Sequence, residues 1–222
     1  MDYSTISTIF RFFETLLDAV VPLRARSART KKRSIADIPL IPTPHDVLGT
    51  RITTLMEYRD PAVQDLIRSL KYDGSAHAAT LAASLLADYL QEEIATQRQF
   101  SARKILIVPV PLHKSRARER GFNQIALVLE RLPKEFQDGT LATLAPETLV
   151  RTHATKPQTK LPRSERLSNV KGAFEVATGF NVHNAHIFLI DDVTTTGATL
   201  KESSAPLKKA GATVTLLALA RA

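Results

Sequence analysis

The chain has 222 residues, a formal net charge of +8 at pH 7 and no cysteine, and 44% of its residues are hydrophobic. This length accommodates one sizeable α/β domain with a small appendage, and the lack of cysteine excludes disulfides and thiolate zinc sites within the chain. No window reaches the roughly 18–20 apolar residues of a membrane-spanning helix. We therefore expect a cytoplasmic protein without a membrane span.

The positive charge is concentrated in three short segments. Residues 24–33, 113–120 and 151–171 are each strongly basic, and the rest of the chain is net acidic. A uniformly basic surface would spread its charge more evenly. The clustering therefore favours local anion-binding sites.

Residues 4–21 repeat apolar side chains with the period of an amphipathic helix that packs on the domain or on a partner. Residues 22–47 contain the basic run 24–33 and four prolines, which predicts an irregular connector. For the run, nucleic-acid contact and a solvated linker both stay open, and the lack of interleaved aromatic residues favours the linker. The chain thus divides into residues 1–47 and a main domain over 48–222.

Strand and helix patterns alternate through the main domain. We expect a turn at Lys71-Tyr72-Asp73-Gly74, helices that begin at Pro61 and near residues 77, 122 and 198, and strands near 50–58, 105–108, 147–150, 174–176, 187–190 and 213–219. This alternation predicts an α/β fold with a central, mostly parallel sheet flanked by helices. Ligands in such folds bind beyond the carboxyl ends of the strands.

The most informative segment runs from Ile187 to Leu200. Four apolar residues that predict a buried strand are followed by Asp191 and Asp192, a turn rich in Thr and Gly, and a helical pattern from Ala198. A helix N-terminus with converging backbone N–H groups suits a phosphate, and paired carboxylates can accept hydrogen bonds from vicinal ribose hydroxyls. Ribose 5-phosphate is the ligand indicated. The alternative is structural, because Asp and Thr also serve as ordinary helix caps.

This segment resembles the phosphoribosyl-pyrophosphate (PRPP) signature of type I phosphoribosyltransferases, which implies a fold of that type. The resemblance implies that Asp191 and Asp192 are the catalytic acids, which bind the ribose hydroxyls directly or through water on Mg²⁺. It also implies that the loop and the first helical residues hold the 5-phosphate. These residues are Thr195, Thr196, Gly197, Ala198 and Thr199.

Two basic loops are candidates for the diphosphate. Lys114 and Arg116 follow the 105–108 strand and are predicted to contact pyrophosphate; the alternative is a solvent-exposed basic turn. Residues 151–172 lack a clear apolar period, which is typical of a lid in a compact domain. This lid would carry Lys156, Gln158 and Thr159; the alternative is a disordered excursion.

Further segments are similar to the ComF family, and the resemblance covers about residues 50–220. It implies a phosphoribosyltransferase-like protein linked to DNA uptake in competent bacteria. Many members carry an amino-terminal cysteine zinc ribbon, which this chain lacks. The segments that carry the resemblance are Lys71–Gly74, Val108–His113, Arg120–Gln124, Arg151-Thr152, Gln158–Leu161 and Arg166–Phe174.

The expected function is a Mg²⁺-dependent phosphoribosyltransferase of ComF type, in which an unidentified base or amine displaces pyrophosphate from PRPP. Residues 48–75 are expected to form the hood that selects this acceptor. The alternative is a catalytically weak PRPP- or nucleotide-binding accessory protein for DNA uptake and competence, in contact with single-stranded DNA or with DNA-uptake proteins. A third alternative, a nucleoside-triphosphate hydrolase, is disfavoured because no Gly-x4-Gly-Lys-Ser/Thr segment occurs.

Overall fold

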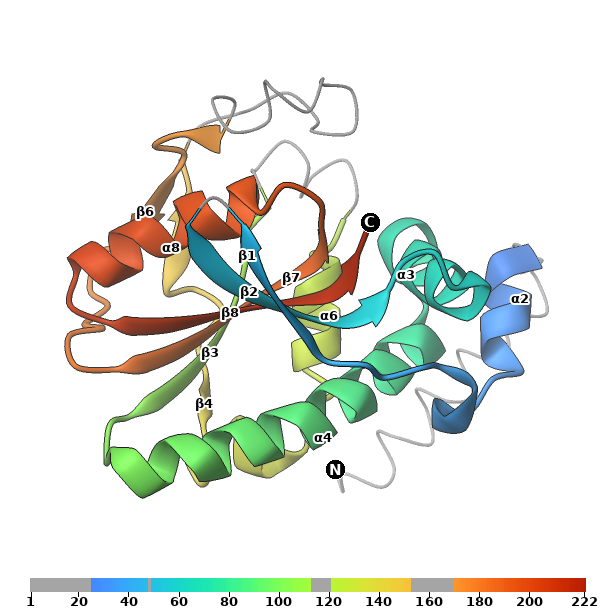
Figure 1. Cartoon of the computed structure of the whole chain (residues 1–222), viewed down its shortest axis with the longest axis horizontal. Coiled ribbons are helices and arrows are strands. Elements are labelled where there is room, and N and C mark those ends of the chain that lie inside the picture. Colours follow the sequence, from blue (N-terminus) through green and yellow to red (C-terminus); the bar gives the residue numbers. More distant parts are fainter. Residues whose placement is uncertain (1–24, 48, 113–120, 153–169) are drawn as a thin grey trace, which may run out of the picture.

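The computed structural model describes residues 25–47, 49–112, 121–152 and 170–222 (Figure 1). The predicted amphipathic helix over residues 4–21 lies outside these ranges. Among the described residues, no helix combines the length and apolarity required to cross a bilayer. The helices are α2 (Ala25–Lys31), α3 (Pro61–Asp73), α4 (Ala76–Phe100), α6 (Gln124–Leu129) and α8 (Ala198–Lys209), with 3₁₀ turns at η1 (Ile35–Asp37) and η2 (Lys134–Phe136).

A six-stranded sheet forms the centre of the molecule. Its order is β1-β2-β8-β7-β3-β4, and every neighbouring pair is parallel except β1 with β2. These strands are β1 (Thr43–Val47), β2 (Thr50–Glu57), β3 (Ile105–Pro109), β4 (Thr143–Leu144), β7 (His186–Thr194) and β8 (Thr213–Arg221). A separate antiparallel ribbon pairs β5 (Leu149–Arg151) with β6 (Phe174–Val176). The predicted α/β class with a mostly parallel sheet is confirmed.

Helices cover both faces of the sheet (Figure 1). Because side chains alternate along a strand, β7 contributes Phe188 and Ile190 to a core shared with α3, α4 and α6. On the other face, Ile187 and Leu189 pack in a core with α8 and the β5–β6 ribbon. All four side chains are fully buried. The central position of β7 explains its continuous apolar run.

Local signals set the ends of the two helices that follow β2. Asp60 caps α3 by accepting hydrogen bonds from the backbone N–H groups of Ala62 and Val63. Gly74 ends the helix in the left-handed conformation, with φ of 58°. Ser75 then caps α4. The turn predicted at Lys71–Gly74 is therefore the last turn of α3 together with its glycine cap.

The prediction of an irregular connector over residues 22–47 was wrong for the described part of that segment. Residues Ala25–Lys31 form α2, which packs beside α3 (Figure 1), and Thr43–Val47 form an edge strand of the main sheet. The predicted boundary after residue 47 thus falls within the β1–β2 hairpin. Pro44 is tolerated in β1 because an edge strand leaves backbone N–H groups outside the ladder.

Candidate functional site

The acidic pair lies near the carboxyl end of β7, in the part of the strand that still pairs with β8. The sequence predicted that the strand ends at Ile190, but it continues through Thr194, because Asp191, Val193 and Thr194 remain in register with β8. On the other side, the pairing with β3 stops at Ile190. Asp191 and Asp192 therefore sit where β7 extends beyond one of its two neighbouring strands.

Each carboxylate also serves the backbone at this strand end. Asp191 Oδ1 accepts a hydrogen bond from the Asp192 N–H at 2.8 Å, and Asp192 Oδ1 accepts one from the Val193 N–H at 2.7 Å. Buried backbone donors require such partners. The helix-cap role considered from the sequence does not apply, because the N-cap of α8 is Gly197. One oxygen of each acid bonds the strand backbone, and the second oxygen is left for other contacts.

The second oxygen of Asp192 is held by side chains from two helices. Gln124 Nε2, at the start of α6, donates to Asp192 Oδ2 at 2.7 Å. Lys71 Nζ, in the last turn of α3, lies 3.8 Å from the same oxygen. Asp192 is only 7% exposed, so these contacts hold a buried carboxylate in one orientation. The sequence analysis missed both as site residues, although both belong to the ComF-like segments.

Asp191 has a different electrostatic environment. Burial, and next the charge of the adjacent Asp192, raise the pKa of Asp191 well above the usual range for an aspartate, and the Lys71 ammonium opposes this effect. The energetic cost of two adjacent carboxylates falls when a proton or a cation neutralises one of them. The acidic pair is therefore a natural place for a positively charged or hydrogen-donating ligand.

The donor chemistry of the acidic pair fits Mg²⁺. Among the described residues, no group of three or more His, Asp or Glu side chains forms a metal cluster. Mg²⁺ commonly binds through one or two carboxylates, keeps several waters and takes its remaining oxygens from substrate phosphates. Asp191 and Asp192 are thus suited to an ion that arrives with a phosphorylated ligand.

The loop between β7 and α8 combines a helix start without a side-chain cap and one buried hydroxyl without a partner in the described structure. Gly197 is the N-cap of α8 and provides no side-chain cap for the first-turn N–H groups. The Thr196 hydroxyl is buried and has no hydrogen-bond partner in the described structure. A helix N-terminus in this state favours an anion. Thr199 is half-buried and Ala198 is buried, so the predicted phosphate residues form one continuous loop and helix start.

Gly197 is required by both conformation and space. Its φ is +68°, and a Cβ atom there would lie 2.7 Å from Ile52 Cδ1 and 3.2 Å from Val47 Cγ1. These two side chains belong to the β1–β2 hairpin, which therefore packs directly against the loop. The amino-terminal strand that the sequence analysis placed in a connector thus supports the candidate phosphate site.

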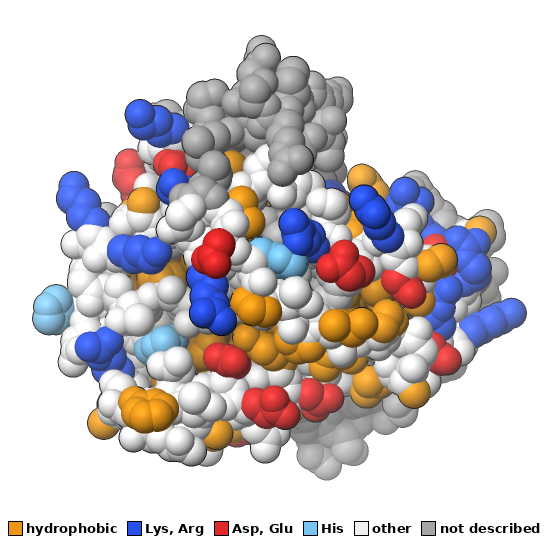
Figure 2. All heavy atoms as spheres, viewed as in Figure 1, with side chains coloured by type: hydrophobic (Ala, Val, Ile, Leu, Met, Phe, Trp, Pro, Cys, Tyr) orange, Lys and Arg blue, Asp and Glu red, His pale blue; other side chains and the backbone are white. Residues whose placement is uncertain are grey.

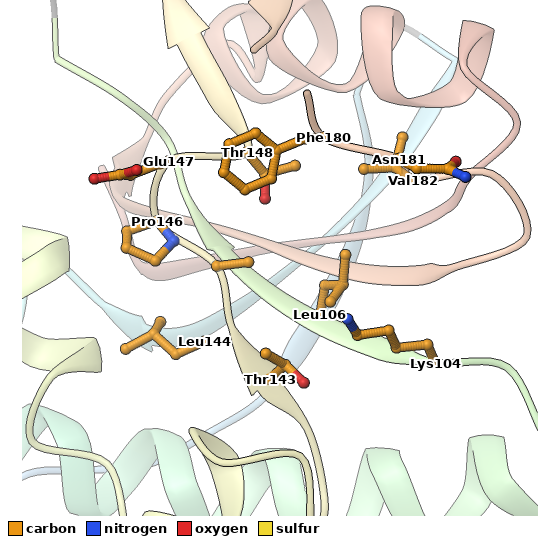
Figure 3. A pocket seen from close by; sticks show the side chains of 11 residues that line it. Lys104, Leu106, Thr143, Leu144, Pro146, Glu147, Thr148, Phe180, Asn181 and Val182 are labelled. Atoms are coloured by element: carbon orange, nitrogen blue, oxygen red, sulfur yellow. The ribbon is translucent and has the colours of Figure 1, made fainter. Parts of the chain in front are cut away.

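The structure brings together Asp191, Asp192 and the loop, and it adds Lys71 and Gln124. The other predicted site residues lie outside the described ranges: Lys114, Arg116, Lys156, Gln158 and Thr159. A cavity of about 340 Å³ lies elsewhere, between the β3–β4 edge and residues 180–182 (Figure 3). Its lining combines apolar side chains with the side chains of Lys104, Thr143, Glu147, Thr148 and Asn181, and it contains none of the predicted site residues.

Comparison with known proteins identifies the family. The chain is 33% identical over 163 residues to the DNA utilization protein YhgH of Escherichia coli K12, an alignment that covers 73% of this chain and 67% of the relative. The chain belongs to the ComF family. It is also 36% identical over 106 residues to Competence protein F of Haemophilus influenzae, covering 47% of this chain and 44% of that protein. Competence protein ComFC of Streptococcus pneumoniae is 29% identical over 151 residues, with coverages of 68% and 59%.

No family model matches the chain. Among solved structures, the orotate phosphoribosyltransferase of Mycobacterium tuberculosis aligns with 11% identity and a TM-score of 0.35, covering 85% of this chain and 79% of that one. The adenine phosphoribosyltransferase of Saccharomyces cerevisiae aligns with 12% identity and a TM-score of 0.32, covering 90% of each chain. The segment from β7 to α8 has the strand, acidic pair, loop and helix that the resemblance to type I phosphoribosyltransferases led us to expect.

Proposed function

We propose that this ComF protein binds PRPP and is a Mg²⁺-dependent phosphoribosyltransferase. The observation that carries the proposal is the start of α8, where an uncapped helix N-terminus and the unpartnered Thr196 hydroxyl lie a few residues after the acidic pair. Groups that lack internal partners gain the most from a ligand that supplies them. A phosphate at α8 and ribose hydroxyls at the acids would satisfy both parts of the site.

The residues have distinct proposed roles. Backbone N–H groups and hydroxyls from Thr195 to Thr199 bind the 5-phosphate, and Asp191 accepts hydrogen bonds from ribose hydroxyls. Asp191 and Asp192 would hold Mg²⁺, in part through water, and the ion would neutralise the diphosphate charge. Lys114 and Arg116 at the pyrophosphate, and the lid residues Lys156, Gln158 and Thr159, remain predictions from sequence.

The proposed reaction is a substitution at C1 of the ribose. A base or amine acceptor donates an electron pair to C1, the bond from C1 to the pyrophosphate oxygen breaks, and pyrophosphate leaves with that electron pair. The acceptor then loses a proton, for which we assign no residue. The contribution of this chain is to position the sugar and to stabilise charge.

A thermal shift assay tests the proposal. At a hundredfold excess over Kd, PRPP with Mg²⁺ should add about 2.7 kcal/mol of stability, which corresponds to roughly 5–10 °C for a chain of this size. Mg²⁺ alone and PRPP with EDTA are the controls for the ligand and the ion. Asp191→Asn should abolish the shift, whereas Asp88→Asn, at an exposed site on α4, should preserve it. No shift with the wild-type protein would contradict PRPP binding.

A second candidate is a PRPP- or nucleotide-binding accessory protein that contacts single-stranded DNA. It is favoured by the relatives, which are named for DNA utilization and competence. Lys and Arg side chains gather near α2 (Figure 2). However, Arg26, Arg29 and Arg33 form ion pairs with Asp65 and Asp73, so DNA that contacted these arginines would have to compete with the two carboxylates. The test therefore uses the two lysines of the run, Lys31 and Lys32.

Salt-dependent binding of a single-stranded oligonucleotide tests this second candidate. Lys31→Ser with Lys32→Ser should reduce the dependence of log K on log salt concentration, because each lost phosphate contact lowers that slope by about 0.7. Lys208→Ser with Lys209→Ser, at the end of α8, is the charge-matched control. An equal slope in both double variants would contradict a DNA contact through α2. Deletion of residues 1–47 is unsuitable, because it would remove β1 from the sheet.

A further inference from the structure

A set of polar contacts joins α2 to the last turn of α3. The Arg26 guanidinium donates to both carboxylate oxygens of Asp73, from Nε at 2.8 Å and from Nη2 at 2.6 Å. The Ser27 hydroxyl donates to Asp73 Oδ2 at 2.6 Å. The same guanidinium lies over the Tyr72 ring, 5.3 Å from its centroid. A bidentate pair of this kind fixes orientation as well as distance.

The turn that α2 holds is the one that carries Lys71. Lys71 precedes Tyr72 and Asp73 in the chain, and its ammonium lies 3.8 Å from Asp192 Oδ2. On the opposite side, a Cβ at Gly74 would lie 3.0 Å from the Phe122 ring, so the end of the turn packs closely on the start of α6. The Lys71 turn is therefore fixed from α2 and from α6.

The Lys71 ammonium is well placed to bind an anion. At 3.8 Å its contact with Asp192 is longer than a hydrogen bond, so the ammonium is held near the acid mainly by charge. The Lys71 side chain is 21% exposed to solvent. The ammonium also stands at the carboxyl end of the sheet, beside the acidic pair and on the ligand side of the fold. A diphosphate group that approached the acids would meet this positive charge.

We propose that Lys71 is a binding residue for the diphosphate of the ligand, and that α2 is a brace that positions it through Arg26 and Asp73. This inference rests on the proposed function for the class of ligand. It also gives the basic amino-terminal run a role that requires no nucleic acid, because Arg26 of this run fixes the end of α3 at the site. Arg26 is a positioning residue, because it acts through the Lys71 turn and contacts no ligand itself.

The chain contains a matched control for this brace. Arg29 forms a second bidentate pair from α2 to α3, with Asp65 at 2.8 and 2.6 Å, and Arg33 contacts the same acid at 3.0 Å. Asp65 lies six residues before Lys71, roughly 9 Å along the helix axis. Loss of the Arg29 pair should loosen α2 without releasing the turn that carries Lys71.

Calorimetric titration with PRPP and Mg²⁺ tests the inference on the full chain. We expect Lys71→Met to weaken binding by about tenfold or more, Arg26→Met to weaken it severalfold, and Arg29→Met to leave it within twofold of wild type. The double variant Arg26→Met with Lys71→Met should bind no more weakly than Lys71→Met alone, because the two residues act in series. Arg26→Lys, which keeps the charge but loses the bidentate geometry, provides a milder change if Arg26→Met folds poorly.

The outcomes separate the inference from the proposed function. Wild-type affinity in Arg26→Met, or additive losses in the double variant, would overturn the brace while PRPP binding stands. If wild-type protein fails to bind PRPP, the diphosphate role of Lys71 is overturned together with the proposed function. In that case the brace is tested by the rate at which acetic anhydride acetylates Lys71, measured by mass spectrometry. The rate should rise in Arg26→Met and not in Arg29→Met, and equal rates in both would overturn the brace.

Discussion

The two halves of the candidate site are built differently. Around Asp192 the polar groups are already paired: Gln124 donates to one oxygen, the Val193 N–H donates to the other, and Lys71 supplies a nearby positive charge. At the start of α8 the helix N-terminus has no side-chain cap, and the Thr196 hydroxyl is buried without a hydrogen-bond partner in the described structure. The contacts around Asp192 fix the orientation of its carboxylate before a ligand binds. At the start of α8, a ligand can supply the hydrogen bonds that the protein itself does not make.

The largest expected effect comes from filling the space at Gly197. Gly197→Ala should lower the free energy of unfolding by about 2–4 kcal/mol, because it combines left-handed strain with a clash against Ile52 Cδ1 at 2.7 Å. Urea denaturation measures the loss. Gly172→Ala is the matched control, with φ of +65° and open space around the added Cβ, and should show only the strain. Equal losses in the two variants would show that close packing of the hairpin on the loop is unimportant.

Asp192→Asn should disrupt the paired half of the site. Both carboxylate oxygens accept hydrogen bonds, from Gln124 and from the Val193 N–H, and an amide can replace only one acceptor. Gln124 can rotate its own amide to accept from the Asn, so the loss comes from replacing a bond to a charged acceptor and from removing the negative charge beside Lys71, and it should be about 1–3 kcal/mol. Chemical denaturation without ligand measures this loss. A variant as stable as wild type would indicate that Asp192 is not fixed by these contacts.

Asp191→Asn should have the opposite effect on stability at alkaline pH. Because the folded protein raises the pKa of Asp191, this group contributes stability below its unfolded pKa of about 4 and loses it as pH rises through the folded value. The Asn variant does not titrate, so its stability relative to wild type should increase from pH 5 to pH 8. A constant difference across this range would contradict the raised pKa.

A smaller effect is expected at the amino-terminal end of the same strand. Burial, and then the charge of Arg103, lower the pKa of His186, whose Nε2 lies 2.9 Å from Thr215 Oγ1. The stability from neutral His186 is present above its unfolded pKa of about 6.5 and is lost as pH falls through the lowered folded value. His186→Gln should therefore lose less stability than wild type between pH 7 and pH 5, as urea denaturation at the two pH values would measure. Parallel pH profiles of the two proteins would contradict this.

Local sequence was sufficient to predict the half of the site at the start of α8, and it was insufficient to predict the contacts around Asp192. The apolar run, the Thr-Gly turn and the helix start are contiguous, so pattern alone located them. The extension of β7 to Thr194 was not predictable in this way, because it depends on pairing with β8. Gln124 contacts Asp192 across 68 residues of sequence, and only its place in a ComF-like segment marked it.

The amino-terminal segment shows the same limit more strongly. α2 is a seven-residue helix, too short to be stable alone, and its ion pairs reach Asp65 and Asp73, 36 and 47 residues further along the chain. Considered by itself, the sequence of this segment shows only a run of positive charge. Likewise, Pro44 favours a connector when only the sequence is considered. The position of β1 at the edge of the sheet explains why the strand tolerates this proline.

The most direct test of the central claim is a comparison of Thr196→Val with wild type. Val keeps the shape of Thr and removes the unpartnered buried hydroxyl, so the variant should be as stable as wild type or more stable. In calorimetric titration with PRPP and Mg²⁺, wild type should bind one equivalent, and the variant should bind about tenfold more weakly. A variant that loses stability and keeps wild-type affinity would contradict the claim that this hydroxyl binds the phosphate of the ligand.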